Sequence, residues 1–152
     1  MVTVMATGTF DILHMGHIYF LKEAKKLGDR LVVIVACDKT VRRLKHEPVT
    51  SEKMRLNLIK ELRMVDKAVL GKENDMFDVV EEINPDVIAL GYDQIHDEKS
   101  LEKEMKNRHI SAKLVRLPKY EKTSDLDGTR RIIAKIIEAY GCQREMEKIE
   151  KK

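Results

Sequence analysis

The chain has 152 residues, long enough for one domain whose hydrophobic core needs neither disulfides nor a structural metal. Its 29 basic and 26 acidic side chains nearly balance, and aromatic residues make up only 5% with no tryptophan, so neither charge nor stacking rings indicate a nucleic-acid partner. The sequence shows no charged leader and no apolar run of membrane-spanning length, so we expect no membrane partner and a cytoplasmic location.

Strand-like and helix-like runs alternate along the whole chain. Strands are expected at five places, at residues 2–7, 31–36, 68–70, 86–90 and 113–117. Amphipathic helices are expected at residues 18–27, 54–65, 75–83, 98–108 and 129–140. The C-caps of two of these helices are expected at Gly28 and Gly141. This alternation predicts an α/β fold, a single Rossmann-like doubly wound domain with a mainly parallel five-stranded sheet.

We expect this domain to occupy residues 1–141, followed by a charged C-terminal extension at residues 142–152. The extension is interpreted as a solvated helix, with a dimer contact through Met146 and Ile149 as the alternative. In a doubly wound sheet, ligands bind beyond the carboxyl ends of the strands, near the point where the strand order reverses. The binding site is therefore expected in the loops that follow Thr7, Ala36, Leu90 and Leu117.

The most informative segment runs from Thr7 to His17 and joins the first expected strand to the first expected helix. Gly8 and Gly16 allow the backbone to approach a ligand closely. His14 and His17 are three residues apart near the helix start, so both can face one side. Free N–H groups at a helix start favour an anion, and two imidazoles there can donate hydrogen bonds to phosphate oxygens during phosphoryl transfer. We interpret the segment as a phosphate site.

Two other interpretations of the histidines compete with this one. They would serve as zinc ligands only with a third ligand at compatible spacing, which the segment lacks. Cys37 and Cys142 match no metal or redox spacing either, so we assign no metal ligand. Alternatively, one histidine caps the helix and the other packs in the core.

The string GTFD at residues 8–11, followed by HMGH at residues 14–17, resembles the signature of the cytidylyltransferase-like nucleotidyltransferases. This family includes glycerol-3-phosphate cytidylyltransferases, pantetheine-phosphate adenylyltransferases and archaeal-type FAD synthases. The resemblance covers residues 2–140 and implies attack of an acceptor phosphate on the α-phosphorus of a nucleoside triphosphate, with pyrophosphate leaving and no covalent enzyme intermediate. It makes His14 and His17 the catalytic residues, with Mg²⁺ or another divalent cation neutralising the triphosphate.

The resemblance also implies the residues that contact each substrate. For the nucleotide these are Thr9, Phe10, His14, His17, Asp93, Ser124, Thr129 and Arg130. For the acceptor they are Asp11, Lys45, Arg55 and Tyr120. Roles without substrate contact stay open for several of these residues: packing for Phe10 and Tyr120, a structural role for Arg55, and a solvated basic helix face for Lys45.

The start of the last helix departs from the pattern of the glycerol-3-phosphate enzymes, in which a glycine precedes a short run of Ser and Thr. Here Asp127 is expected to cap the helix. Arg130 stands where a second threonine is usual and would replace lost hydrogen bonds with charge. Whether Ser124 or Thr129 contacts the triphosphate stays open.

Within the family, residues 43–71 and 85–94 are most similar to archaeal-type FAD synthases. This implies FMN as the acceptor, ATP as the donor and FAD as the product, and resemblance to related enzymes implies a homodimer. One alternative is a glycerol-3-phosphate cytidylyltransferase that uses CTP. An alternative of another class is a nucleotide-binding module that has lost catalysis.

Overall fold

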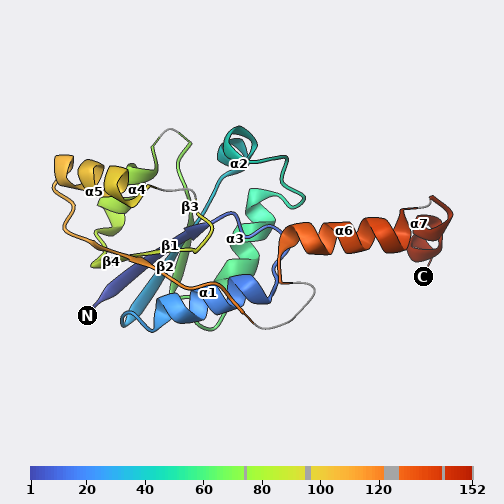
Figure 1. Cartoon of the computed structure of the whole chain (residues 1–152), viewed down its shortest axis with the longest axis horizontal. Helices are drawn as coiled ribbons and strands as arrows, with labels where there is room; N and C mark the ends of the chain where they lie inside the picture. The colour runs from blue at the N-terminus through green and yellow to red at the C-terminus, as the bar shows by residue number, and fades with distance from the viewer. Residues whose placement is uncertain (74, 95–96, 122–126, 142, 152) are drawn as a thin grey trace.

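The computed structural model describes residues 1–73, 75–94, 97–121, 127–141 and 143–151, with backbone alone for 143–146. Within these ranges five strands occur: β1 (Thr3–Gly8), β2 (Arg30–Val35), β3 (Lys67–Leu70), β4 (Val87–Leu90) and β5 (Lys113–Arg116). They form one sheet in the order β3-β2-β1-β4-β5, in which each neighbouring pair is parallel (Figure 1). The predicted strands are confirmed, and every end lies within one residue of its expected position.

The helices of the described ranges are α1 (Met15–Lys25), α2 (Asp38–Leu44), α3 (Glu52–Lys60), α4 (Met76–Ile83), α5 (Glu98–Asn107), α6 (Thr129–Tyr140) and α7 (Gln143–Glu150). Helix α3 is shorter than the expected helix at 54–65, because the apolar residues after Lys60 lie in the turn that leads to β3. The short helix α2 forms from the basic run after β2.

Helices cover both faces of the sheet. On one face, Val4 of β1 belongs to a buried cluster with Leu21 of α1 and Ile59 of α3. On the other face, Met5 of β1 belongs to a second cluster with Val80 of α4 and Met105 of α5. Because neighbouring residues of one strand point to opposite faces, β1 is buried on both sides, and the doubly wound architecture is confirmed.

The strand order shows where the chain changes direction. From β1 the chain moves outward through β2 to β3, then returns to the other side of β1 for β4 and β5. The order therefore reverses between β1 and β4, and a crevice at the carboxyl ends of these strands is the usual ligand site of such sheets. The loops after Gly8 and Leu90 flank this point, as expected.

Two predicted helix caps are wrong. Helix α1 ends at Lys25 with Lys26 as its C-cap, so Gly28 lies beyond the cap. Gly28 is needed there for close packing, because a Cβ would come within 2.7 Å of the carbonyl oxygen of Val2. At the start of α6 the N-cap is Gly128, and Asp127 precedes it. The cap expected at Gly141 is confirmed.

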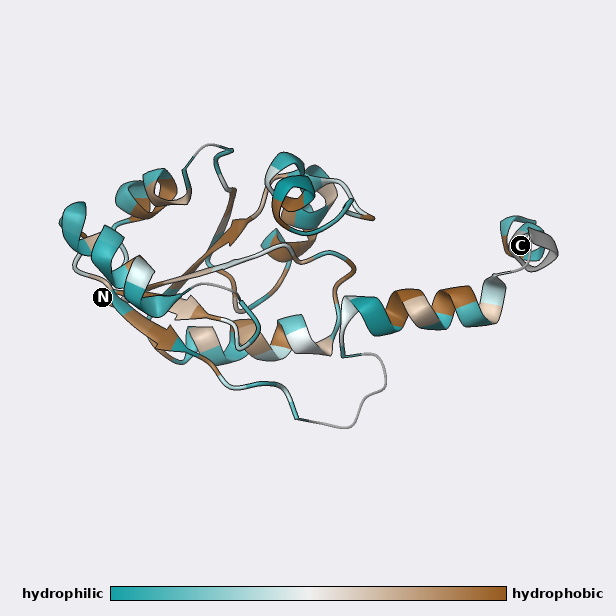
Figure 2. Ribbon diagram, turned by 45° about the horizontal axis from the view of Figure 1, so that its top comes forward, coloured by the Kyte–Doolittle hydropathy of each residue, from teal (hydrophilic) through white to brown (hydrophobic). Residues whose placement is uncertain are grey.

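Helix α6 leads away from the sheet toward α7 and the C-terminus (Figure 1). None of its residues is buried, and hydrophobic and hydrophilic residues alternate along it outside the core (Figure 2). Its exposed apolar side chains include Ile136, Ile137 and Tyr140. The domain boundary after Gly141 stays a prediction. Among the described residues, no helix has the length and apolar character needed to cross a membrane.

Candidate active site

The two histidines of the HMGH string lie against each other at the start of α1. His14 is the N-cap, and its Nδ1 accepts a hydrogen bond from the backbone N–H of Gly16 at 3.1 Å. The ring of His17 stacks on that of His14, with ring centroids 3.7 Å apart and an angle of 25° between the planes. Because Nδ1 of His14 is an acceptor, a neutral His14 carries its proton on Nε2. The structure thus brings the predicted pair together at a helix N-terminus.

Both imidazoles are held in the neutral form at pH 7. Burial lowers the pKa of His17 to about 3; repulsion from His14, when that ring is protonated, and from Lys45 lowers it further, and Asp11 opposes this. Burial also lowers the pKa of His14, and the carboxylates of Asp127 and Asp93 oppose this. Among the described side chains, Nδ1 of His17 is the one buried polar atom with no hydrogen-bond partner.

The start of α6 meets the start of α1. The Oγ1 of Thr129, the first residue of α6, donates a hydrogen bond of 2.7 Å to the carbonyl oxygen of Asp11 in the loop before α1. The carbonyl oxygen of Asp127 lies against Gly16, so closely that a Cβ on Gly16 would come within 2.5 Å of it. Gly16 is therefore required for the contact between these two segments, and the N-termini of α1 and α6 lie side by side.

The charges in the first turns of the helices single out these two N-termini. Helices α2 to α5 each carry an acidic residue in the first turn, namely Asp38, Glu52, Asp78 and Glu98. Neither α1 nor α6 has one. The first turn of α6 instead contains Arg130 and Arg131, cations where the helix dipole disfavours them. Arg131 already pairs with Asp127 at 3.0 Å, so an anionic ligand would stabilise the free N–H groups and the charge of Arg130. This signal was readable from the sequence once the helix starts were placed.

The turn after β4 approaches the same point from the other side of the strand reversal. Asp93 is exposed, and its carboxylate lies close enough to His14 to act on its pKa. Gln94, which the site prediction did not assign a role, joins the two strands. Its Nε2 donates to the carbonyl oxygen of Thr7 at 2.6 Å, and its Oε1 accepts from the N–H of Gly91 at 3.3 Å. Gln94 thus holds the turn of Asp93 beside the loop after β1.

Asp11, expected to contact the acceptor, is buried and bonded within the protein. Its carboxylate accepts hydrogen bonds from the N–H groups of Val49 and Thr50, at 2.7 and 2.9 Å, and from Oγ1 of Thr50 at 2.6 Å. Burial raises the pKa of Asp11, but these hydrogen bonds and the charge of Arg55 outweigh burial and hold the pKa below its usual value. The side chain is an ionised anchor for the segment before α3.

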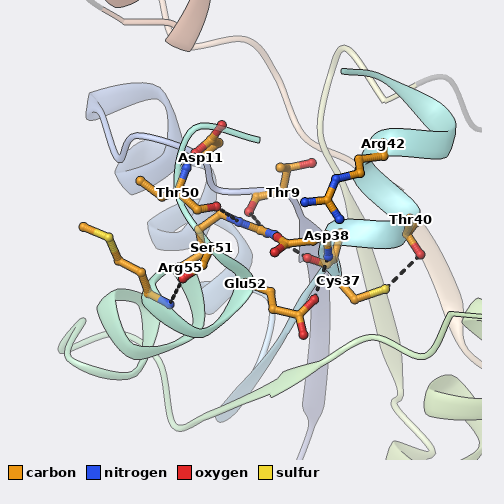
Figure 3. Close-up of polar contacts among 12 residues, drawn as sticks. Thr9, Asp11, Cys37, Asp38, Thr40, Arg42, Thr50, Ser51, Glu52 and Arg55 are labelled. Carbon is orange, nitrogen blue, oxygen red and sulfur yellow. Dashed lines mark hydrogen bonds and ion pairs between the residues drawn. The ribbon is translucent and has the colours of Figure 1, made fainter. Parts of the chain in front are cut away.

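Arg55, also expected to contact the acceptor, has no exposed surface. Its guanidinium makes hydrogen bonds to Thr9, Ala36, Thr50 and Asp38 (Figure 3). This geometry favours the structural alternative for Arg55 that the sequence left open.

The remaining expected contacts are distributed unevenly. Phe10 is buried in the core, and its ring makes an edge contact with that of His17, with ring centroids 5.4 Å apart. This favours packing as its role. The ring of Tyr120 lies 5.2 Å from that of Tyr19 on α1, again a packing contact. Lys45 is exposed at the end of α2, close enough for its charge to act on His17. The backbone carbonyl of Thr9 is bonded to Arg55, Arg130 is exposed, and Ser124 lies outside the described residues.

A parallel sheet with a histidine pair and two helix N-termini at the strand reversal is typical of nucleotide-binding α/β proteins. The chain belongs to the cytidylyltransferase-like family, whose model matches residues 5–134. It is 57% identical over 138 residues to a FAD synthase of Aciduliprofundum boonei, covering 91% of this chain and 92% of the relative. It is also 57% identical over 135 residues to a FAD synthase of Methanothermus fervidus, covering 87% and 92%. The resemblance inferred from the two motif strings is confirmed.

A solved structure from Thermoplasma volcanium GSS1 has the same architecture. That protein, described as a lipopolysaccharide core biosynthesis protein, is 54% identical and superposes with a TM-score of 0.78, covering 80% of this chain and 99% of its own.

Proposed function

We propose that this protein transfers AMP from ATP to FMN. A phosphate oxygen of FMN attacks the α-phosphorus of ATP, the bond from that phosphorus to the bridging oxygen breaks, and FAD and pyrophosphate form. The observation that carries the proposal is the meeting of two helix N-termini without first-turn acids at a stacked, neutral histidine pair. The choice of FMN and ATP rests on the relatives named FAD synthase at 57% identity.

In this reaction the histidines bind the phosphates at the reacting centre. Neutral His14 donates from Nε2, because its Nδ1 accepts from Gly16. His17 stacks on it and stabilises the charge that moves onto the leaving pyrophosphate. Neither side chain needs to form a bond to phosphorus, because substrate positioning and charge stabilisation account for catalysis of this type.

We assign the tail of the triphosphate to the start of α6. The single proton of the Thr129 hydroxyl is already donated to the carbonyl of Asp11, so this side chain does not donate to phosphate in this conformation. The free N–H groups of the first turn and the exposed guanidinium of Arg130 are the donors left for the β- and γ-phosphates. We propose that Lys45, whose charge reaches His17, holds the phosphate of FMN, and that Asp93 binds a ribose hydroxyl or the divalent cation.

A divalent cation fits this site through substrate phosphates rather than through a protein cage. Among the described residues, no group of three or more His, Cys, Asp or Glu side chains is placed to hold a metal ion. Mg²⁺ commonly binds one or two carboxylates together with phosphate oxygens. Of the two carboxylates close to His14, Asp127 already pairs with Arg131 at 3.0 Å, so Asp93 is the one left for the cation. We propose Mg²⁺, which when bound neutralises triphosphate charge.

The test is product analysis of the purified protein with Mg²⁺ in three parallel mixtures: FMN with ATP, FMN with CTP, and glycerol 3-phosphate with CTP. FAD and pyrophosphate from the first mixture alone are expected. CDP-glycerol from the third mixture would contradict the assignment of both substrates. Binding of nucleotide without any product would favour the non-catalytic alternative. His17→Ala, run beside each mixture, links any product to the histidine site.

Three further expectations go with this function. We propose a homodimer that buries the exposed apolar side chains Ile136, Ile137 and Tyr140 of α6. Light scattering should then give twice the chain mass of 17.6 kDa, and Ile137→Lys should shift it toward the monomer. We also propose that the enzyme acts in the cytoplasm and binds no nucleic acid; a fluorescent oligonucleotide titration at physiological salt tests the second point.

A further inference from the structure

We infer that Arg55 and Asp11 form a clamp that positions the histidine loop, and that neither side chain binds the acceptor. The loop clamp consists of these two side chains and the segment of Val49 and Thr50 between them in space. The inference rests on the proposed function only for its kinetic readout.

Arg55 ties together three segments at the carboxyl edge of the sheet. Its Nη1 donates to the carbonyl oxygens of Thr9, after β1, and Ala36, after β2, at 2.8 and 2.7 Å. Its Nε donates to the carbonyl oxygen of Thr50 at 3.1 Å, before α3, and its Nη2 pairs with Asp38 at 2.5 Å. Figure 3 shows the guanidinium between these groups. A planar fork of donors suits this geometry, whereas the point charge of a lysine does not.

Asp11 closes the clamp from the other side. Its carboxylate accepts three hydrogen bonds from Val49 and Thr50, and the carbonyl oxygen of Thr50 accepts from Arg55. The histidine loop is thereby held at Thr9 by Arg55 of α3 and at Asp11 by the segment that precedes α3. The carbonyl of Asp11 also accepts from Thr129, so the clamp reaches the start of α6.

The held loop has a backbone shape that it would not adopt alone. Phe10 and Ile12, on either side of Asp11, have φ angles of 56° and 51°, in the left-handed region that favours glycine. For a β-branched residue such as Ile12 this is an outlier, and such conformations persist only where surrounding contacts impose them. Asp11, between the two residues, receives those contacts.

The consequence for catalysis is positional. His14 follows Asp11 by three residues and begins α1, so the clamp sets where the stacked imidazoles meet the phosphates. A displacement of about 1 Å at a reacting centre costs up to about 10²-fold in rate. Loss of the clamp should therefore lower turnover more than it weakens substrate binding, because Lys45, Asp93 and Arg130 lie outside the clamp.

The experiment compares Arg55→Lys with Arg108→Lys by steady-state kinetics and thermal unfolding. Arg108 is a matched control because it also pairs with several carboxylates, Asp75, Glu81 and Glu104, but between α4 and α5 on another part of the fold. We expect Arg55→Lys to lower kcat at least about tenfold, with KM for FMN and for ATP within about threefold of wild type. Arg108→Lys should lower the Tm and leave kcat unchanged. Asp11→Asn, which keeps the side-chain size, should behave like Arg55→Lys.

A rise in KM for FMN alone, with kcat retained, would mean that Arg55 binds the acceptor and would overturn the clamp. Unchanged kcat in both Arg55→Lys and Asp11→Asn would also overturn it. If the wild-type protein makes no FAD, the proposed function has failed, and ¹H–¹⁵N spectra of the imidazoles still test the clamp. The signals of His14 and His17 should move in Arg55→Lys but not in Arg108→Lys, and unmoved signals in both would contradict the inference.

Discussion

Arg55 and His17 are basic side chains beside the same loop, and they differ in their hydrogen-bond partners. Arg55 is fully buried, yet it makes four hydrogen bonds, one of them to the carboxylate of Asp38. His17 is neutral, with a pKa of about 3 and an unpartnered Nδ1. A buried cation with this many partners has a structural task, because its donors are used within the protein. The imidazole pair at the N-termini of α1 and α6 is therefore the place where we propose that the ligand binds.

The largest effect on stability is expected when the cation of the loop clamp is removed. Arg55→Met leaves the carboxylate of Asp38 and three carbonyl groups without their partner, so the free energy of unfolding should fall by about 3–5 kcal/mol. Urea unfolding followed by circular dichroism measures this. A fall in the free energy of unfolding below about 1 kcal/mol would show that the hydrogen bonds of Arg55 do not hold the loops after β1 and β2.

The next largest effect is expected on turnover, when one histidine of the stacked pair is removed. His17→Ala should lower kcat for FAD formation by about 10²–10³-fold, because a preorganised donor to the reacting phosphates is lost. Circular dichroism and the Tm should show a folded protein, since no buried partner of His17 is left unpaired. Turnover near the wild-type value would contradict the assignment of this site.

Because folding lowers the pKa of His17, the stability of the protein should depend on pH. The unfolded His17, with a pKa near 6.5, takes up a proton as the pH falls, whereas the folded side chain stays neutral until about pH 3. The unfolded state therefore binds more protons in this window, and stability falls as the pH is lowered from 6.5 toward 3 and is constant above. The slope is at most about 1.4 kcal/mol per pH unit. In His17→Gln, unfolding between pH 6.5 and 4.5 should lose this part of the slope; an unchanged slope would show that His17 is protonated in the folded protein.

The hydrogen bond between the start of α6 and the loop before α1 should contribute less to stability. Thr129→Val removes the hydrogen bond to the carbonyl of Asp11 and should lower the free energy of unfolding by about 1 kcal/mol. The KM for ATP should rise less than about threefold if the triphosphate is held by N–H groups and Arg130 rather than by this hydroxyl. A much larger rise would return Thr129 to the nucleotide-binding residues.

The smallest effect is expected at an exposed pair. Lys26→Ala breaks a surface ion pair with Glu23, in which the lysine side chain is 69% exposed. Solvent screens such a pair and its side chains are mobile, so neither the Tm nor kcat should change measurably. A drop in Tm of several degrees would show that this exposed ion pair stabilises the fold, contrary to our account.

Much of the fold could be predicted because its signal is local. Continuous apolar runs such as residues 31–36 located the buried strands to within a residue. The pair of His14 and His17 was found from its spacing and its place after a strand. Even the acid-free first turn of α6 is written in the sequence, once the helix start is known.

The clamp could not be predicted in the same way. Arg55 bonds to carbonyl oxygens of Thr9, Ala36 and Thr50, and a main-chain oxygen leaves no mark in the sequence. The same holds for Gln94, whose amide joins main-chain groups of β1 and the turn after β4. The left-handed backbone of Ile12 is also hidden, since its residue type argues against it.

The most direct test of the central claim is a ¹H–¹⁵N spectrum of the imidazole side chains, recorded with and without Mg²⁺ and α,β-methylene-ATP. We expect the free protein to show a neutral His17 at pH 6 and a neutral His14 above pH 7 with its proton on Nε2, and both rings to shift when the nucleotide analogue binds. The Arg55→Lys variant should bind the analogue but show altered imidazole positions. Saturating binding by calorimetry with unchanged histidine signals would contradict the account, because the nucleotide would then lie elsewhere.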